Sequence, residues 1–292
     1  MKKIVIIKPN CRELANHLWN YVSIYAYGIE TGARIQNPSF FQWHQYFNLI
    51  EKESFITRMI SYLHPLSSLW RVLLSFCGSY LIRANARCVR LTLGITMSLP
   101  PTKPLVTRGD VCETTYFIGW HFRNPVGLEC HRGALIAAFM PKERVLKKIE
   151  ATVAPFQGKR LIGVHVRQEP FKGFDDESFL VPLSRVRCIV EEYLLEKKLT
   201  AEDVVLVVVS DTGVESTAFA GYTTHVRHGN DVTSLFLLSK CDVVIGTNSI
   251  FSNLASWFGD VPHIVTTNEP IDWKYYRNTT EYFENKYATF AQ

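Results

Sequence analysis

The chain has 292 residues, of which 47% are hydrophobic and 20% are charged. This length predicts two domains of about 100 to 200 residues each, and the composition excludes a largely disordered chain. The formal net charge is +5, and the basic residues are dispersed, which favours a phosphate-bearing small ligand over a nucleic-acid duplex. We therefore expect a folded two-lobed protein with no nucleic-acid partner.

The first predicted elements are a buried strand at Ile4 to Ile7 and a helix from about Asn16 to Gly32. The apolar run of the strand is too short to be a signal peptide. The seven cysteines form no Cys-x-x-Cys pair, and their odd number leaves at least one thiol unpaired within the chain. We therefore expect a reducing, cytoplasmic location.

Residues 59–83 are apolar and aromatic, but Pro65 and Arg71 interrupt them, so they contain no clean transmembrane span. One interpretation is that they form core helices of the first lobe. The other is a helix on a membrane surface, with Arg58, Arg71 and Arg83 near the headgroups. The second interpretation predicts a peripheral contact with the inner membrane surface through residues 59–83.

The C-terminal half has the alternation of short apolar runs and helical segments that is typical of a parallel sheet with crossover helices. A helix at 142–153 precedes it, and the polar stretch around Gly158 separates that helix from the first strand. We therefore predict an α/β protein of two lobes, 1–157 and 158–292. The predicted strands are 161–166, 203–209, 223–226, 242–246 and 263–267, and the predicted helices are 182–198, 232–240 and 251–259.

The sequence Gly163-Val-His-Val-Arg167 ends the first strand of the C-terminal lobe, and ligands of open α/β sheets bind beyond the carboxyl ends of the strands. A guanidinium at Arg167 can hold a diphosphate through two oxygens and offset the charge that grows on a leaving nucleotide. Its alternative role is that of a salt-bridge partner. His165 shares this face of the strand, where it either contacts the ligand or orients a loop through hydrogen bonds.

A second group of polar residues lies between Asp231 and Ser252, where a helix, a short buried strand and the start of another helix follow one another. The backbone N–H groups at that second helix start have no partner within the helix and form an anion site. We expect Asn248, Ser249 and Ser252 to face a phosphate. The alternatives are that Ser249 or Ser252 only caps this helix, and that Asp231 only caps the preceding one.

These motifs resemble, in order and spacing, the three motifs of the fucosyltransferase superfamily, which contains α-1,2-, α-1,6- and protein O-fucosyltransferases. The first is His165-Val-Arg167 and the second is Ser210-Asp211, after a Val-rich strand. The third runs from Asp231 to Ser252 and includes Asn248, Ser249, Phe251 and Ser252. Near the N-terminus, Asn16 and His17 stand where the α-1,2 branch has a related motif, so the resemblance spans most of the chain.

The resemblance implies a GT-B-type architecture of two Rossmann-like lobes, an N-terminal acceptor-side lobe and a C-terminal donor lobe. It implies an inverting glycosyltransferase that moves fucose from GDP-fucose to a hydroxyl of a glycan or glycoconjugate acceptor, without a cofactor or a bound metal. The sequence agrees on the metal, because the C-terminal lobe has no Asp-x-Asp motif. The implied donor-binding residues are His165, Arg167, Asp211, Asp231, Asn248, Ser249, Phe251 and Ser252.

The chain departs from the family where the first motif usually continues with Arg-Gly-Asp, because it has Gln168, Glu169 and Pro170 there. Two alternatives therefore stay open. One is a related two-lobed transferase that uses another nucleotide sugar or a pyruvyl group, and the other is a non-catalytic carbohydrate-binding relative. A second copy of the first motif, His225-Val-Arg227, precedes Asp231 in the wrong order, and we interpret it as an ordinary strand.

Glu13 is the predicted catalytic base, because it lies in the loop beyond the first strand, three residues before Asn16, and a protein O-fucosyltransferase branch carries a glutamate at the similar place. The alternatives are that Glu13 caps the helix or pairs with Arg12. Asn16 and His17 are the predicted acceptor-side residues. The acidic run Asp175-Asp-Glu177 is interpreted as a solvated turn rather than a metal site.

Overall fold

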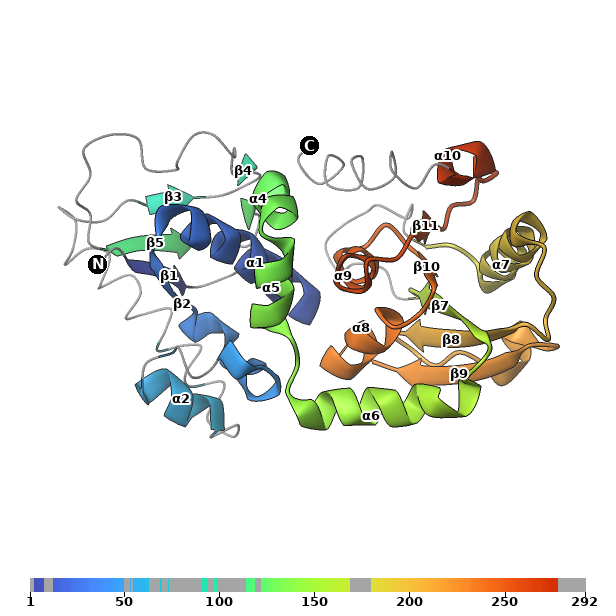
Figure 1. Cartoon of the computed structure of the whole chain (residues 1–292), viewed down its shortest axis with the longest axis horizontal. Coiled ribbons are helices and arrows are strands. Elements are labelled where there is room, and N and C mark those ends of the chain that lie inside the picture. The colour runs from blue at the N-terminus through green and yellow to red at the C-terminus, as the bar shows by residue number, and fades with distance from the viewer. Residues whose placement is uncertain are drawn as a thin grey trace. The chain divides into compact units, whose positions relative to one another are not determined.

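The computed structural model describes residues 3–7, 13–49, 53, 55–62, 69, 73, 91–93, 97–98, 114–118, 122–168, 180–229 and 231–277. They fall into two compact units, the first ending at Lys142 and the second beginning at Glu143 (Figure 1). The helix α6 (Glu143–Val153) and the 3-10 turn η5 (Ala154–Phe156) therefore belong to the second unit, although the sequence analysis placed them in the first lobe. The reason is that α6 packs against a helix of the second unit, α8 (Val232–Leu238).

The first unit contains short strands, and helices form much of the described chain between them. Its strands are β1 (Lys3–Ile7), β2 (Arg34–Gln36), β3 (Leu91–Leu93), β4 (Met97–Ser98), β5 (Thr114–Ile118) and β6 (Phe122–Arg123). Its helices are α1 (Leu14–Thr31), α2 (Phe55–Tyr62), α4 (Pro125–Cys130) and α5 (Arg132–Phe139), with 3-10 turns η1 (Pro38–Phe40) and η2 (His44–Tyr46).

Four of these strands form a parallel sheet in the order β2-β1-β5-β3, and β4 pairs in parallel with β6. The predicted first strand and first helix are present as β1 and α1. Helix α1 ends where Gly32 adopts the left-handed conformation, with φ of 64°, and its N–H caps the last carbonyls of the helix. The sequence analysis missed β2 to β6, because each of these short strands contains polar residues and none forms a continuous apolar run like that of β1.

The second unit follows the predicted elements closely. Its strands are β7 (Arg160–Val166), β8 (Val204–Ser210), β9 (Thr223–His228), β10 (Val243–Gly246) and β11 (His263–Val265). Its helices, besides α6 and α8, are α7 (Leu183–Lys197), α9 (Ile250–Gly259) and α10 (Trp273–Arg277), with a 3-10 turn η7 (Ser216–Phe219).

The five strands of the second unit form one parallel sheet in the order β11-β10-β7-β8-β9. The chain enters at the central strand β7, runs outward to β9, and then crosses back to β10 on the other side of β7. This is the Rossmann order, and the direction of winding switches between β7 and β10. The central strands are buried along almost their whole length, which explains the continuous apolar run of β8.

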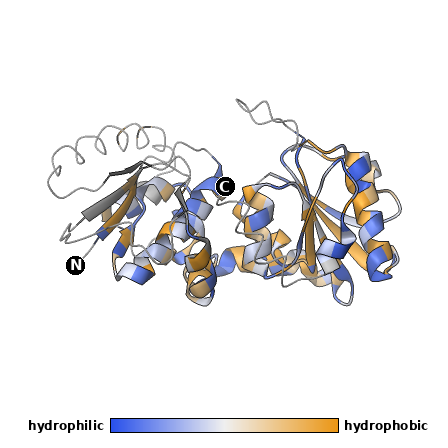
Figure 2. Ribbon diagram, turned by 90° about the horizontal axis from the view of Figure 1, so that it is seen from above, coloured by the Kyte–Doolittle hydropathy of each residue, from blue (hydrophilic) through white to orange (hydrophobic). Residues whose placement is uncertain are grey.

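Helices cover both faces of this sheet, and the apolar strands lie between them (Figure 2). Val164, Val208 and Ile245 share one core cluster with residues of α7. On the opposite face, the Cα of Gly163 lies beneath Leu238 of α8, so close that a Cβ there would be 2.9 Å from the leucine Cδ2. Because side chains alternate along a strand, His165 and Arg167 belong to the same face as Gly163.

Among the described residues, no helix is long and apolar enough to cross a membrane.

Candidate active site

The candidate site lies at the carboxyl ends of β7 and β10, which is the topological switch point of the second sheet. Gly246, the last residue of β10, is paired in register with His165 of β7. Each strand then leads into one of the motifs singled out in the sequence, Arg167 after β7 and Asn248 with Ser249 after β10. The sheet therefore brings together two segments that are about 80 residues apart in the chain, at the place where open α/β sheets bind ligands.

His165 joins these two segments through a buried polar network. Its side chain is buried, and its Nδ1 lies 2.7 Å from the hydroxyl of Ser252 and 3.5 Å from that of Ser249. The two serine hydroxyls are 3.2 Å apart. The network holds the start of α9 against the end of β7, and so the loop-orienting role left open for His165 is present in the structure.

Ser249 is also the N-cap of α9, because its hydroxyl accepts a hydrogen bond from the backbone N–H of Ser252 at 3.3 Å. The capping role left open for Ser249 is therefore present. One cap satisfies only one of the first backbone N–H groups of a helix. The beginning of α9 thus keeps the partial positive charge and the donors that favour an anion. Asn248 is exposed just before it, and its side-chain oxygen accepts a hydrogen bond from Asn253 at 3.4 Å.

Close packing fixes the position of this helix start. The ring of Phe251 stacks on the ring of His165, with centroids 5.0 Å apart and planes 29° from parallel. A Cβ at Gly246 would lie 2.8 Å from the Ser252 hydroxyl oxygen and 2.9 Å from the His165 Cβ. Only glycine lets β10, β7 and α9 approach this closely, a reason for Gly246 that the sequence pattern alone did not reveal.

A second buried network, which the sequence analysis did not identify, supports α9 from the side of β11. Asn253 donates from its amide to the Ser249 carbonyl at 2.8 Å and its oxygen lies 3.0 Å from Nδ1 of His263. The other ring nitrogen of His263 lies 3.2 Å from the carbonyl oxygen of Gly246. The signal in the sequence was a histidine at the start of an otherwise apolar strand, which is indistinguishable from an ordinary core residue.

Arg167 follows β7 directly and is half-buried. Next to it, the backbone N–H of Gln168 donates to a carboxylate oxygen of Asp211 at 3.0 Å, and the side chains of Gln168 and Thr212 are hydrogen-bonded. The carboxylate of Asp211 therefore anchors the chain that follows β7 to the loop that follows β8. The predicted donor contact of Asp211 stays a prediction.

Asp231 has the capping role that the sequence left open. Its carboxylate accepts a hydrogen bond from the backbone N–H of Ser234 at the start of α8, at 2.7 Å. The same carboxylate forms an ion pair with Arg227, at 2.7 Å. Arg227 also donates to the hydroxyl of Ser234 at 2.8 Å. It lies on β9, at the edge of the sheet and two strands from β7, where His225-Val-Arg227 forms an ordinary strand.

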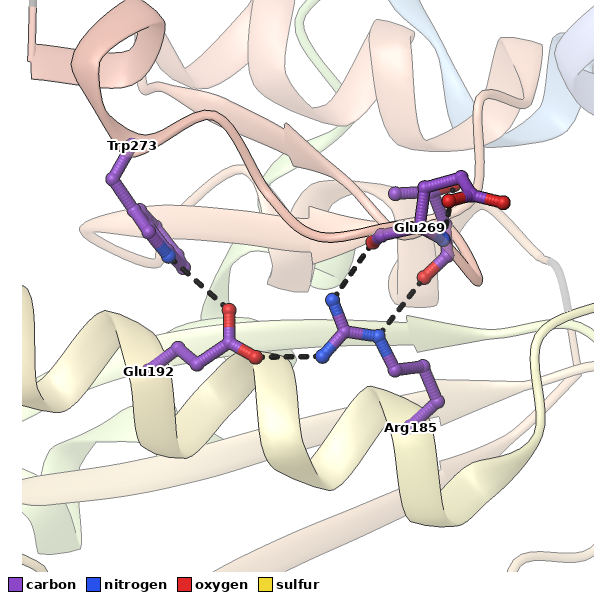
Figure 3. Close-up of polar contacts among 5 residues, drawn as sticks. Arg185, Glu192, Glu269 and Trp273 are labelled. Atoms are coloured by element: carbon purple, nitrogen blue, oxygen red, sulfur yellow. Dashed lines mark hydrogen bonds and ion pairs between the residues drawn. The ribbon is translucent and has the colours of Figure 1, made fainter.

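A polar clamp fixes the segment that leaves the carboxyl end of β11, the edge strand on the side opposite β9 (Figure 3). From α7, Arg185 donates to the carbonyl oxygens of Thr267 at 3.2 Å and Glu269 at 2.9 Å. Its third contact is an ion pair with Glu192 at 2.6 Å. Glu192 in turn accepts a hydrogen bond from the indole N–H of Trp273 at 3.1 Å. Arg185 and Glu192 together thus link α7, the loop after β11 and α10.

The predicted acceptor-side residues lie at the start of α1 in the first unit. Glu13 is exposed at the N-cap position, with no capping hydrogen bond from its side chain, so the structure gives no support to the capping alternative. Asn16 is half-buried. His17 is buried and packs against the ring of Trp43, with centroids 4.6 Å apart. Trp43 is a neighbour that sequence reasoning missed.

The first unit also contains a buried ionisable cluster around Glu53. One carboxylate oxygen of Glu53 accepts a hydrogen bond from the backbone N–H of Asn37 at 2.6 Å, and lies 3.5 Å from both the Tyr21 hydroxyl and Nε2 of His44. Burial raises the pKa of Glu53 to about 7, although the bonds from Asn37 and Tyr21 act in the opposite direction. Burial and the charge of Lys142 lower the pKa of His44 to about 3. The sequence analysis found nothing specific in this region.

No group of three or more metal-ligating side chains occurs among the residues that the structure describes. Asp175-Asp-Glu177 lies outside them.

No family model matches the chain, and no curated protein matches it. Among solved structures, it is similar to POFUT1 in complex with GDP-fucose, with 8% identity over 91% of this chain and 98% of that chain and a TM-score of 0.55. It is similar to a mutant of Arabidopsis thaliana FUT1 in complex with GDP, with 14% identity over 90% of this chain and 70% of that chain and a TM-score of 0.50. It is also similar to NodZ alpha-1,6-fucosyltransferase soaked with GDP-fucose, with 14% identity over 88% of this chain and 93% of that chain and a TM-score of 0.48.

At these identities the likeness concerns the fold. The chain has the α/β architecture with parallel sheets of the GT-B fucosyltransferase structures, and the predicted fold class is confirmed.

Proposed function

We propose that this protein is an inverting glycosyltransferase that moves fucose from GDP-fucose to a hydroxyl of a glycan or glycoconjugate acceptor. The observation that carries the proposal is the arrangement at the switch point, where His165 of β7 is hydrogen-bonded to Ser252 at the start of α9 and Arg167 follows two residues later in the chain. The fold neighbours that bind GDP or GDP-fucose support a nucleotide-sugar donor.

In the proposed reaction, the acceptor hydroxyl attacks the anomeric carbon of the donor sugar from the face opposite the diphosphate. The bond from that carbon to the diphosphate oxygen breaks, and the hydroxyl proton passes to a base. The guanidinium of Arg167 and the backbone N–H groups at the start of α9 stabilise the negative charge that develops on the leaving diphosphate. Because the start of α9 is held in place before the reaction, its N–H groups need little reorganisation in the transition state.

Glu13 is the proposed base. The side chain of Glu13 is exposed, so a substrate hydroxyl can approach its carboxylate. A base of this kind must come within hydrogen-bond distance of the attacking hydroxyl. Asn16 and His17 are proposed to contact the acceptor.

Two alternatives remain because Gln168, Glu169 and Pro170 stand where the family usually has Arg-Gly-Asp. One is a two-lobed transferase with another nucleotide sugar or a pyruvyl donor, and the other is a carbohydrate-binding protein without catalysis. The structure uses Gln168 to join the loops after β7 and β8, a role that does not depend on the donor. A cytoplasmic location also remains a proposal.

The test is the thermal midpoint of the protein in the presence of GDP, GDP-fucose, GDP-mannose, UDP-glucose and CMP-sialic acid. A ligand that binds only the folded state raises the free energy of unfolding, by about 2.7 kcal/mol when its concentration is a hundred times Kd, and the thermal midpoint rises with it. We expect GDP and GDP-fucose to stabilise the protein and the UDP and CMP sugars not to. If only a UDP or CMP sugar stabilised the protein, GDP-fucose would not be the donor. If GDP-fucose bound but was neither hydrolysed nor transferred to any glycan, the non-catalytic alternative would hold.

A further inference from the structure

The first unit has an exposed apolar surface on α2. Phe55 and Met59 are 78% and 47% exposed, and they lie four residues apart, on the same side of the helix. Arg58, between them, is exposed as well. Large apolar side chains with a basic residue beside them on one helix face are typical of helices that lie in the interface of a membrane.

The same feature is repeated further along the chain. Leu69 and Leu73 are helical residues, again four positions apart, and they are 67% and 47% exposed. Seven large hydrophobic side chains are exposed among the described residues, and these four are within 19 residues of one another. Isolated exposed apolar residues need no explanation, but two such helical pairs so close in the sequence favour a contact surface.

The charge of this part of the sequence indicates what the surface contacts. Between Ser54 and Gly109 there are seven arginine and lysine residues and no aspartate or glutamate, whereas the rest of the chain has slightly more acidic than basic residues. The basic residues are spread out rather than consecutive, and yet this one region accounts for the whole net positive charge. A purely basic region suits an anionic partner.

We propose that this protein docks on anionic lipid bilayers through a surface that includes Phe55, Arg58 and Met59 of α2 and Leu69 and Leu73. Hereafter this is the docking surface. The apolar side chains enter the boundary between headgroups and acyl chains, while Arg58 keeps its guanidinium at the level of the lipid phosphates. This proposal does not depend on the proposed function, because lipid binding needs neither a donor nor an acceptor. Residues 63–68, 70–72 and 74–83 of the predicted contact lie outside the described residues.

An anionic bilayer fits the observations better than a protein partner. A polar protein interface would carry charges of both signs around its rim, whereas here the acidic residues are missing over more than fifty positions. A basic residue near an anionic leaflet contributes about 1 kcal/mol, so Arg58 adds to the binding energy of the inserted apolar side chains.

The test is co-sedimentation of the full chain with vesicles, without substrate. We expect binding to vesicles of phosphatidylcholine mixed with phosphatidylglycerol, weak binding to phosphatidylcholine alone, and release at about 1 M salt, where the Debye length falls to about 3 Å. Arg58→Glu should lower the partition coefficient about fivefold or more, from the loss of about 1 kcal/mol per basic residue. Phe55→Ser with Met59→Ser, and separately Leu69→Ser with Leu73→Ser, should lower it on both kinds of vesicle.

The matched controls lie in the second unit. Leu195 is 80% exposed and Lys240 is exposed, so Leu195→Ser and Lys240→Glu repeat the same changes of polarity and charge away from the docking surface. They should bind vesicles as the parent does. The proposal is overturned if the parent protein ignores anionic vesicles, or if the controls lose binding as strongly as the docking-surface variants. It is also overturned if the docking-surface variants change only the oligomeric mass, because the surface would then join two copies of the chain.

Discussion

Arg167 is the single side chain on which the proposed chemistry depends most. We predict that Arg167→Ala lowers kcat by about a hundredfold or more, on the order of 3 kcal/mol, because a group that stabilises transition-state charge is removed. Arg167→Lys should restore little, since a point charge cannot replace the planar guanidinium. Steady-state kinetics with GDP-fucose measures both. A folded Arg167→Ala variant with near-normal kcat would mean that the arginine has no catalytic role.

Glu13 is the next residue to test, because its exposed carboxylate is the proposed base. We predict that Glu13→Gln keeps the fold and the donor affinity, since the amide has the same shape, while transfer to the acceptor falls steeply and the acidic limb of the pH–rate profile disappears. Glu150→Gln, at an exposed position on α6, is the control and should leave transfer unchanged. Transfer by Glu13→Gln within a few-fold of the parent would place the base elsewhere.

The start of α9 is the element that the site requires, and its position depends on a glycine. We predict that Gly246→Ala weakens donor binding and lowers the thermal midpoint, because the new methyl group would lie 2.8 Å from the Ser252 hydroxyl and 2.9 Å from the His165 Cβ. Overpacking of this kind typically costs about 1 to 3 kcal/mol. Thermal unfolding with and without GDP measures the two effects.

Gly133 provides the matched control, since a Cβ there would meet nothing within 4 Å on the exposed face of α5. Gly133→Ala should be neutral or stabilising, by up to about 1 kcal/mol, because alanine favours helix over glycine. If Gly246→Ala bound GDP as well as the parent, the contact between His165 and α9 would not contribute to the donor site.

The stability of the whole protein should depend on pH through Glu53. Its pKa is about 7 in the folded state against an ordinary value of 4.5, so the protonated carboxyl stabilises the fold. That contribution is complete below pH 4.5, declines as the pH rises and is lost above about 7, with an amplitude of about 3 kcal/mol. We predict that Glu53→Gln abolishes this decline. Urea unfolding at a series of pH values measures it.

Comparing the parent with Glu53→Gln separates the contribution of Glu53 to the pH dependence from those of the other ionisable groups in the cluster. His44 has a lowered pKa, so its contribution is present above pH 6.5 and is lost towards about 3, in the parent and in the variant alike. Burial and the nearby Glu53 charge raise the pKa of Tyr21, which therefore does not titrate in this range. If the free energy of unfolding varied with pH in the same way for the parent and for Glu53→Gln, the pKa of Glu53 would not be raised in the folded protein.

The sequence by itself determined the second unit and the identity of most of its candidate site residues. Its strands are mostly continuous apolar runs and its main helices have helical periodicity, and parallel strands place their carboxyl ends at one edge. His165, Ser249 and Ser252 could therefore be assigned to one region before the strand order was known. Their donor contacts were inferred from the resemblance and remain predictions, as does the role of Arg167.

Only the tertiary structure decided how these residues are used. The order of β7 and β10 in the sheet sets His165 against Ser252, Gly246 allows that approach, and a hydrogen bond from Gln168 ties Asp211 to the chain after β7. The Glu53 cluster could not be predicted from the sequence, because it too depends on tertiary contacts. A carboxyl acquires a raised pKa from the atoms packed around it, and these come from segments far apart in the chain, so local periodicity carries no trace of them.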